Sequence, residues 1–170
     1  GDVVRQDLTR DLGFSKEDRD KNIRRVTFVA ELLSNKGVAT TCSFISPYRN
    51  ARAAARARCR NFIEVYVECP FETLVARDPK GLYKKALTGE ITGFTGVDDP
   101  YEPPESPEIV VHTGIESVEQ STRVIVDYLE YNRFLARRDD ASIQAAPTEL
   151  VNRIAQHPEN LPVPDGPSVT

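Results

Sequence analysis

The side chains best suited to binding chemistry lie in a glycine-rich tract over residues 78–100. Lys80 offers a point charge for a phosphate or sulfate group, and Phe94 offers a flat face for stacking. Gly93 and its neighbouring glycines let the backbone approach and move, so the tract can close over an anionic, planar ligand. We interpret it as a lid over a nucleotide. The alternative is that its lysines solvate a surface helix and Phe94 fills the core.

A second group of candidate binding residues lies near the start of the chain, in a predicted loop and the first turns of a predicted helix. Arg19 and Asn22 are three residues apart and share a helix face, while Arg5 and Phe14 can fold back towards them. These side chains suit an aromatic anion, because they combine a ring with cations. The alternative is a solvated helix start with weak surface salt bridges.

Other polar groups indicate less. Five arginines between Arg49 and Arg60 resemble a nucleic-acid patch, but the net charge is −4 and an i, i+4 arginine stripe is typical of an exposed helix face, so we expect no nucleic acid partner. Asp98 and Asp99 are interpreted as turn formers, and His112 as non-catalytic. Three cysteines without a CxxC pattern predict neither disulfides nor a zinc site. No apolar run is long enough for a membrane helix, so we expect a cytoplasmic protein without a membrane partner.

The elements that must position these groups alternate between helices and strands. The S-x-x-D opening at Ser15 predicts a helix over 15–36. Its expected buried side chains are Ile23, Val26, Ala30 and Leu33. Residues 38–44 are rich in β-branched side chains and predict a strand. Ser46 with Pro47 then predicts the start of a helix that runs to about Cys59.

The second half of the chain continues this alternation. Residues 62–68 are the strongest predicted strand, and a short helix to about Arg77 follows them. Residues 108–112 predict another strand, and residues 117–135 a helix whose expected buried side chains are Val118, Ile125, Tyr128 and Leu129. The alternation predicts an α/β fold class, a three-layer parallel sheet whose ligands gather at the carboxyl ends of the strands.

Both ends of the sequence carry signals of their own. There is no methionine, and the chain opens on Gly1-Asp2, so we expect a fragment whose natural N-terminus lies upstream. Residues 1–135 are predicted to form one domain. Residues 136–170 are rich in charged, proline and glycine residues and predict a linker or disordered tail, with one helical stretch over 148–156.

Seven ordered sequence blocks resemble adenylylsulfate kinase (APS kinase), and the similarity runs from Gly1 to about Tyr131. The blocks are Gly1-Asp2-Val3-Val4-Arg5, Asp11-Leu12-Gly13-Phe14-Ser15, Glu17-Asp18-Arg19 with Asn22-Ile23-Arg24-Arg25, Ser43-Phe44-Ile45-Ser46-Pro47-Tyr48-Arg49, Arg77-Asp78-Pro79-Lys80-Gly81-Leu82-Tyr83-Lys84, Gly93-Phe94-Thr95-Gly96 and Asp98-Asp99-Pro100-Tyr101-Glu102. The resemblance implies an α/β fold of the P-loop kinase type, here N-terminally incomplete. It implies transfer of the γ-phosphoryl group of ATP to the 3′-hydroxyl of adenosine 5′-phosphosulfate (APS), which gives PAPS for sulfate activation. It also implies ATP and Mg²⁺ as cofactors, and a homodimer.

The resemblance further implies roles for matching residues. Asp2 would stand beside the magnesium ion and the acceptor hydroxyl, as a catalytic and metal-binding residue. Phe14 and Phe94 would sandwich the adenine of APS, and Arg77 would lie near the ATP base. The implied substrate-binding residues are Arg5, Phe14, Arg19, Asn22, Ile45, Ser46, Lys80, Gly93 and Phe94. Ser46 also aligns with a serine that some family members phosphorylate, although it suits a helix N-cap equally well.

The sequence departs from the family pattern at one place that matters for activity. The G-x-x-x-x-G-K-[ST] loop is absent from residues 1–170, and Val3 and Asp7 stand where the family usually has Asn and Gly. Because that loop supplies backbone donors and a lysine to the ATP phosphates, we expect the 170-residue chain alone to form little PAPS. Two alternatives stay open: a non-catalytic module that binds APS or another nucleotide, and a related P-loop kinase of a different small metabolite.

Overall fold

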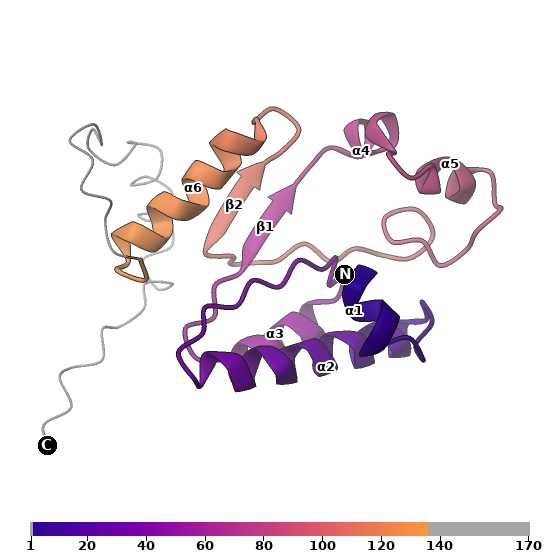
Figure 1. Ribbon diagram of the computed structural model, residues 1–170. Coiled ribbons are helices and arrows are strands. Elements are labelled where there is room, and N and C mark those ends of the chain that lie inside the picture. The colour runs from indigo at the N-terminus through magenta and orange to yellow at the C-terminus, as the bar shows by residue number, and fades with distance from the viewer. Residues whose placement is uncertain (1, 136–170) are drawn as a thin grey trace, which may run out of the picture. The chain divides into compact units, whose positions relative to one another are not determined.

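The computed structural model describes residues 2–135, which divide into two compact units. The first unit comprises the residues up to Phe62 together with Phe71–Pro104, and the second comprises Ile63–Pro70 and the described residues from Glu105 onward. Figure 1 shows helices in the first unit, and two strands with a helix in the second. The predicted tail over 136–170 and its helical stretch over 148–156 lie outside the described residues.

The first unit holds every residue for which a binding role is predicted. Its helices are α1 (Asp2–Asp7), α2 (Lys16–Ser34), α3 (Arg49–Arg58), α4 (Phe71–Arg77) and α5 (Leu82–Leu87). Three of them, α2, α3 and α4, match helices that the sequence predicts. The other two, α1 and α5, lie where the sequence predicts a loop and the lid tract.

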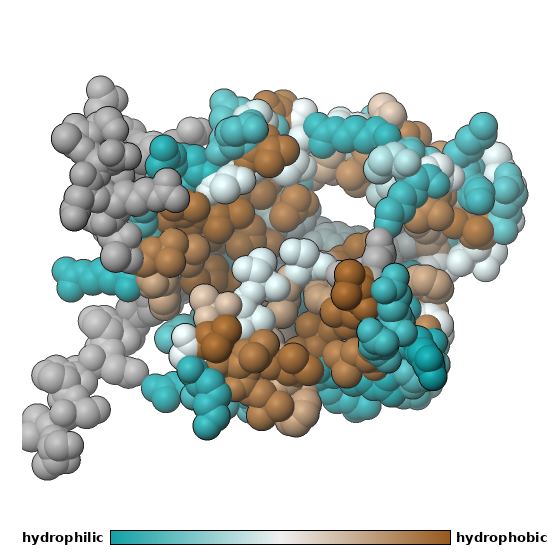
Figure 2. Space-filling view, in the orientation of Figure 1, coloured by the Kyte–Doolittle hydropathy of each residue, from teal (hydrophilic) through white to brown (hydrophobic). Residues whose placement is uncertain are grey.

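Helix α2 begins where its sequence predicts. The hydroxyl oxygen of the N-cap Ser15 accepts a hydrogen bond from the Asp18 backbone N–H at 3.1 Å, which satisfies one of the free donors of the first turn. Val26 is buried as expected, and α2 packs against α3. The predicted burial of Leu33 is wrong, because no described element covers that face of the helix. Leu33 is 40% exposed, and apolar surface gathers along α2 in Figure 2.

The segment between α2 and α3 differs from its prediction. Residues 38–48 have no regular structure, so the strand predicted over 38–44 is wrong. Its β-branched side chains favour extended backbone, but a strand also needs a neighbour to bond with, and no described strand pairs with this segment. The N-cap of α3 is Tyr48, while Ser46 has a left-handed φ of 41°. Ser46 is therefore not the N-cap, since N-cap backbone is extended.

The tract interpreted as a lid contains helix α5. The carboxylate of Asp78 accepts hydrogen bonds from the backbone N–H groups of Tyr83 at 3.1 Å and Lys84 at 3.0 Å. These two donors belong to the first turn of α5, so one side chain caps the helix and folds the chain back after α4. Lys84 and Lys85 are exposed on α5. Their position agrees with the alternative interpretation, in which the lysines of this tract solvate a surface helix.

The second unit is a parallel pair of strands packed against one helix. β1 (Val65–Glu68) pairs in parallel with β2 (Ile109–His112), and Glu68 lies opposite His112 at the carboxyl ends. Ile109 and Val111 are buried together with Tyr128 of α6 (Val118–Tyr131). The two strands form one side of this core, and α6 packs on it from the other side. A parallel strand pair covered by a helix confirms the α/β fold class.

Helix α6 opens with a complete capping box. The side chains of Ser117 and Gln120 each accept a hydrogen bond from the other residue's backbone N–H, at 3.2 and 2.7 Å. Ile125 and Leu129 pack against the core as predicted, whereas Val118 is 78% exposed and its predicted burial is wrong. Val118 stands directly after the N-cap, before the helix reaches the sheet. None of the helices described over residues 2–135 is long and apolar enough to cross a membrane.

Candidate functional site

One guanidinium group joins two segments that both carry predicted binding residues. Arg19, near the start of α2, donates from Nε to the Phe14 carbonyl oxygen at 2.8 Å. It also donates to the Thr95 hydroxyl at 2.7 Å and to the Gly93 carbonyl oxygen at 2.6 Å. The Arg19 side chain is only 11% exposed, and hydrogen bonds from a charged donor are stronger than neutral ones. Arg19 therefore fixes the segment before α2 against the loop that leads into Phe94.

The Phe14 ring is presented to solvent beside two cations. Phe14 is 64% exposed, and the guanidinium carbons of Arg5 and Arg19 lie 4.4 and 5.9 Å from its ring centroid. Arg5 also donates to the carbonyl oxygens of Leu12 and Gly13, at 3.3 and 3.4 Å, which holds α1 against the turn before Phe14. The structure thus brings Arg5, Phe14 and Arg19 together, as their predicted roles require.

The loop from Gly93 to Asp99 is folded on its own backbone. The two carboxylate oxygens of Asp98 accept hydrogen bonds from the N–H groups of Gly93 at 2.7 Å and Phe94 at 2.6 Å. Both hydrogen bonds hold the pKa of Asp98 below its usual value, and the bond from Gly93 contributes most to this shift. Gly93 has a φ of 68°, a conformation that costs glycine little and other residues more.

The Phe94 ring packs against the helix that follows Lys80. Its centroid lies 5.0 Å from that of Tyr83 in α5, edge to face, and Tyr83 meets Phe71 of α4 in the same manner at 6.0 Å. Such aromatic pairs add stability beyond the area that they bury. Lys80 is exposed in the turn between α4 and α5, three residues before Tyr83. The ring contacts therefore join the two halves of the lid tract.

The segment that carries Ile45 and Ser46 is tied to the same loop through a tyrosine. Tyr48 is 3% exposed, and its hydroxyl donates to the Asp99 carboxylate at 2.8 Å. Burial of the Tyr48 hydroxyl, reinforced by the hydrogen bond to Asp99, raises its pKa to about 12. Ile45 is 64% exposed and available for contact with a ligand.

Arg52 makes a second link between these segments. It donates to the Ser46 carbonyl oxygen at 2.7 Å and to the Glu102 carbonyl oxygen at 2.6 Å. The Glu102 backbone N–H in turn donates to the carbonyl oxygen of Pro47 at 2.8 Å. The interpretation of the arginine stripe as an exposed helix face therefore fails at Arg52, because its planar fork reaches two carbonyl groups at once.

Asn22 is buried with an unused acceptor. It is 6% exposed, and its Oδ1 accepts no hydrogen bond from the described residues. A buried polar atom without a partner is costly, so an N–H or O–H group that reached this oxygen after a local rearrangement would be stabilising. Asn22 lies three residues after Arg19 on α2, which places it on the same face of the helix.

Two further predicted residues lie at the ends of helices. Asp2 begins α1, and its side chain is not among those that the structure describes. Arg77 is the last residue of α4 and is exposed. Within residues 3–135, no group of three or more His, Cys, Asp or Glu side chains could hold a metal ion. The described part of the chain therefore provides no metal cage of its own.

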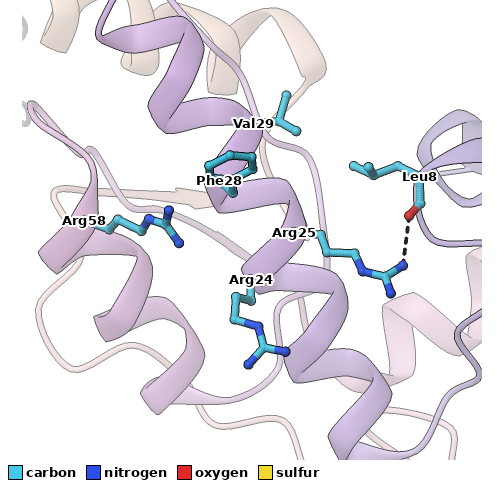
Figure 3. Close-up of a pocket in the computed structure, with 6 residues that line it drawn as sticks. All are labelled: Leu8, Arg24, Arg25, Phe28, Val29 and Arg58. Atoms are coloured by element: carbon cyan, nitrogen blue, oxygen red, sulfur yellow. Dashed lines mark hydrogen bonds between the residues drawn. The ribbon is translucent and has the colours of Figure 1, made fainter.

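A hollow of about 430 Å³ lies elsewhere on the first unit and contains none of the predicted binding residues. It is lined by Leu8, Arg24, Arg25, Phe28, Val29 and Arg58, as Figure 3 shows. Arg25 donates to the Leu8 carbonyl oxygen at 3.0 Å and pairs with Asp11 at 2.6 Å, and Arg58 pairs with Glu31 at 2.6 Å. Two of the three guanidinium groups that line the hollow are therefore already paired with carboxylates.

Sequence reasoning gave no binding role to Tyr48, Thr95 or Asp99. The interpretation of Asp98 as a turn former holds, since its carboxylate bonds the backbone of its own loop. For Asp99 it is incomplete, because that carboxylate reaches Tyr48, which is 51 residues away in sequence. The available signal for Asp99 was the pair of adjacent carboxylates after a glycine-rich loop. Local sequence does not show that one of them accepts a hydrogen bond from the distant Tyr48 hydroxyl.

Comparison with known proteins decides the family. The family model described as adenylylsulphate kinase matches residues 1–112. The chain belongs to the adenylylsulfate kinase family. It is 55% identical over 140 residues to the adenylyl-sulfate kinase of Halothermothrix orenii, covering 82% of this chain and 76% of that one. It is 54% identical over 137 residues to the adenylyl-sulfate kinase of Rippkaea orientalis, with 81% and 76% covered.

Solved adenylylsulfate kinases share the fold. The Mycobacterium tuberculosis APS kinase, solved in complex with AMPPNP and APS, matches with a TM-score of 0.72 and 40% identity over 76% of each chain. A hexameric APS kinase from Thiobacillus denitrificans matches with a TM-score of 0.58 and 30% identity, over 79% of this chain and 22% of that one. The family resemblance of the sequence and its fold of the P-loop kinase type are confirmed. So is the prediction of a nucleotide-using phosphotransferase of sulfate activation.

Proposed function

We propose that the first unit of this adenylylsulfate kinase binds APS, the acceptor substrate, between Phe14 and Phe94. The observation that supports this most is the position of Arg19, which bonds the Phe14 carbonyl oxygen and the Gly93 carbonyl oxygen at the same time. Two aromatic residues on distant segments are thereby held by one side chain. A purine stacked between them gains several contacts without base-specific hydrogen bonds.

The charged end of APS meets the cations that surround Phe14 in this proposal. A guanidinium group has five N–H donors, and three of those on Arg19 are used within the protein, so two can reach a phosphosulfate oxygen. Arg5 lies over the same ring, and we assign Asn22, which follows Arg19 by one helical turn, to the wall of the same pocket. Lys80 from the lid tract, and Ile45 with Ser46 from the segment before α3, complete the proposed pocket.

The reaction itself needs alignment more than covalent chemistry from the protein. In phosphoryl transfer, catalysis comes mainly from positioning the acceptor hydroxyl in line with the phosphoryl group and from stabilising charge. We assign Asp2 to receive or orient the proton of the APS 3′-hydroxyl, and Arg77 to the neighbourhood of the ATP base. Ser46, which is half-buried in its loop, is also assigned as a phosphorylation site.

A magnesium ion fits this scheme only if the protein and the substrate phosphates coordinate it together. The described residues contain no cluster that holds a metal by itself, but Mg²⁺ is usually bound through one or two carboxylates plus the phosphates of the substrate. Asp2 is the residue that we propose to contribute from this chain. When bound, the ion would neutralise charge on the transferred phosphoryl group. A homodimer and a cytoplasmic location complete the proposal.

Isothermal titration calorimetry of the 170-residue chain with APS tests the proposal. We expect saturable binding of APS and weaker binding of guanosine 5′-monophosphate, which can stack but lacks the sulfate group. Arg19→Ala should weaken APS binding, whereas Arg24→Ala should not, because Arg24 is exposed on the same helix and lines the separate hollow. If APS does not bind while another small alcohol is phosphorylated, a related kinase of a different metabolite is the better assignment.

A non-catalytic binding module is the second candidate. Such a module would retain the APS pocket without transferring a phosphoryl group. A coupled assay of PAPS formation by the full-length protein separates the two, because only a kinase would form PAPS there. Binding of APS without PAPS formation is what the sequence predicts for the chain as it stands, and clear PAPS formation would refute that prediction.

A further inference from the structure

The loop that carries Phe94 is held by side chains that have no substrate contact in the scheme above. We propose that Tyr48, Asp98 and Asp99 are positioning residues for APS binding, which hold Phe94 where it can stack on the adenine. This inference rests on the proposed APS site and deepens it. The three residues act through the loop backbone and through Arg19, so they differ from groups that touch the substrate.

Asp98 fixes the backbone on which Phe94 stands. Its carboxylate accepts from the N–H groups of Gly93 and Phe94, at 2.7 and 2.6 Å, so the two peptide units on either side of the Gly93 Cα are oriented, and the second of them leads directly into Phe94. The carbonyl oxygen of Phe94 accepts from the N–H groups of Val97 at 3.0 Å and Asp99 at 3.2 Å. With its N–H and its C=O both bonded, Phe94 has little backbone freedom left. Its ring is restrained as well by the edge-to-face contact with Tyr83 at 5.0 Å.

Asp99 fixes the same loop to the rest of the first unit. It accepts from the Tyr48 hydroxyl at 2.8 and 3.0 Å, and its carboxylate lies 3.8 Å from Arg19 Nε. Thr95, which receives a hydrogen bond from Arg19, also lies within 3.5 Å of Asp99. The loop is therefore attached to α2 through Arg19 and to the start of α3 through Tyr48. Both attachments are side chains that are largely buried, which limits competition from water.

The benefit of this arrangement is a lower entropic cost of binding. A flexible loop must be ordered when its aromatic residue stacks on a ligand, and that ordering reduces the affinity. Here the ordering is done by contacts within the protein. Loss of one contact should leave the Phe94 side chain intact but let it sample other positions, so the affinity for APS should fall although no ligand contact has been removed.

Hydrogen–deuterium exchange of the 170-residue chain without nucleotide tests the first half of the inference. In Asp98→Ala we expect the amides of Gly93 and Phe94 to exchange about tenfold faster or more, because both lose a charged acceptor. Asp98→Asn keeps one carbonyl oxygen that can accept, so the exchange rates should fall between those of the wild type and Asp98→Ala. A third variant, Tyr48→Phe, removes the hydroxyl that bonds Asp99. Its matched control is Tyr131→Phe, because Tyr131 is half exposed on α6 in the other unit.

Calorimetry with APS tests the second half through a double-mutant cycle. Tyr48→Phe and Asp98→Ala should each weaken APS binding about fivefold to tenfold in the wild-type background. In the Phe94→Ala background the same substitutions should have no further effect, because the ring that they position is gone. A residue that merely stabilises the fold would weaken APS binding equally in both backgrounds, so the cycle separates positioning from general stability.

Each outcome decides a different statement. Unchanged amide exchange in Asp98→Ala, or equal losses of affinity with and without Phe94, overturns the positioning role even if APS binds normally. If the wild-type chain does not bind APS, the proposed function fails and the substrate role of these residues fails with it, whatever the exchange shows. Circular dichroism of each variant ensures that a folded protein is being compared, and Asp98→Asn provides the folded variant if Asp98→Ala unfolds.

Discussion

Replacement of Arg19 by lysine distinguishes the two ways in which this residue can serve APS binding. If Arg19 supplies only a positive charge to the phosphosulfate, lysine should keep most of the affinity. If it holds the Phe14 segment and the Gly93 loop together, lysine should be nearly as poor as alanine. The structure favours the second reason, because three separate acceptors surround the guanidinium at 2.6–2.8 Å. An ammonium group is a single point of charge and cannot span them.

The size of the effect follows from these contacts. Hydrogen bonds to charged groups contribute about 1.5–3 kcal/mol each to stability, and those made by one side chain do not simply add. We therefore expect Arg19→Ala to lower the free energy of unfolding by about 3 kcal/mol and to weaken APS binding about 100-fold, which corresponds to about 2.7 kcal/mol. Arg19→Lys should lose at least about tenfold in affinity, because the bonds to two of the three acceptors cannot be remade.

The assay is APS titration by calorimetry, with urea unfolding followed in parallel. Arg24→Lys is the control, because Arg24 is exposed on the same helix and should tolerate the change with no measurable loss of affinity. Affinity of Arg19→Lys within about threefold of the wild type would show that charge alone matters and would refute our reasoning about the junction.

Three further predictions follow from the same loop. Phe94→Ala should weaken APS binding about tenfold to 100-fold in calorimetry, since stacking of a base on an aromatic ring contributes about 1–3 kcal/mol; unchanged affinity would remove Phe94 from the pocket. Gly93→Ala should lower the free energy of unfolding by about 1 kcal/mol in urea titrations, because φ is 68° there while the space around the new methyl group is open. Tyr48 should titrate at about pH 12 in an absorbance titration near 295 nm, and this step should be missing in Tyr48→Phe. Because the folded protein favours the neutral phenol, its contribution to stability is complete below about pH 10 and is lost as the pH rises towards 12, so the wild type should lose more stability than Tyr48→Phe over that range.

The elements with strong local signals could be predicted from sequence. Helix α2 begins at the capping serine Ser15, α6 begins at Ser117, and both strands lie within the ranges that their apolar runs indicate. Capping and periodicity depend on residues a few positions apart, so the sequence contains their cause. The family resemblance was equally accessible, because ordered motifs over most of the chain are a property of sequence alone.

Elements that depend on a partner could not be predicted in this way. Residues 38–44 have the composition of a strand, yet a strand forms only where another one offers hydrogen bonds, and none of the described strands does so. Leu33 has helical spacing with Val26, but burial requires something to pack on it. Local composition sets a preference, and distant segments decide whether it is satisfied.

For the site, the sequence determined which side chains are present, and the tertiary structure decided which of them share a task. Phe14, Arg19 and Phe94 could be named as candidates because rings and guanidinium groups suit an aromatic anion. Arg19 uses three of its N–H donors to hold two segments together, and only the tertiary structure shows this. The pairing of Tyr48 with Asp99 likewise joins residues 51 apart. Hydrogen bonds act over about 3 Å, so their partners are set by how the chain folds and not by their order in the sequence.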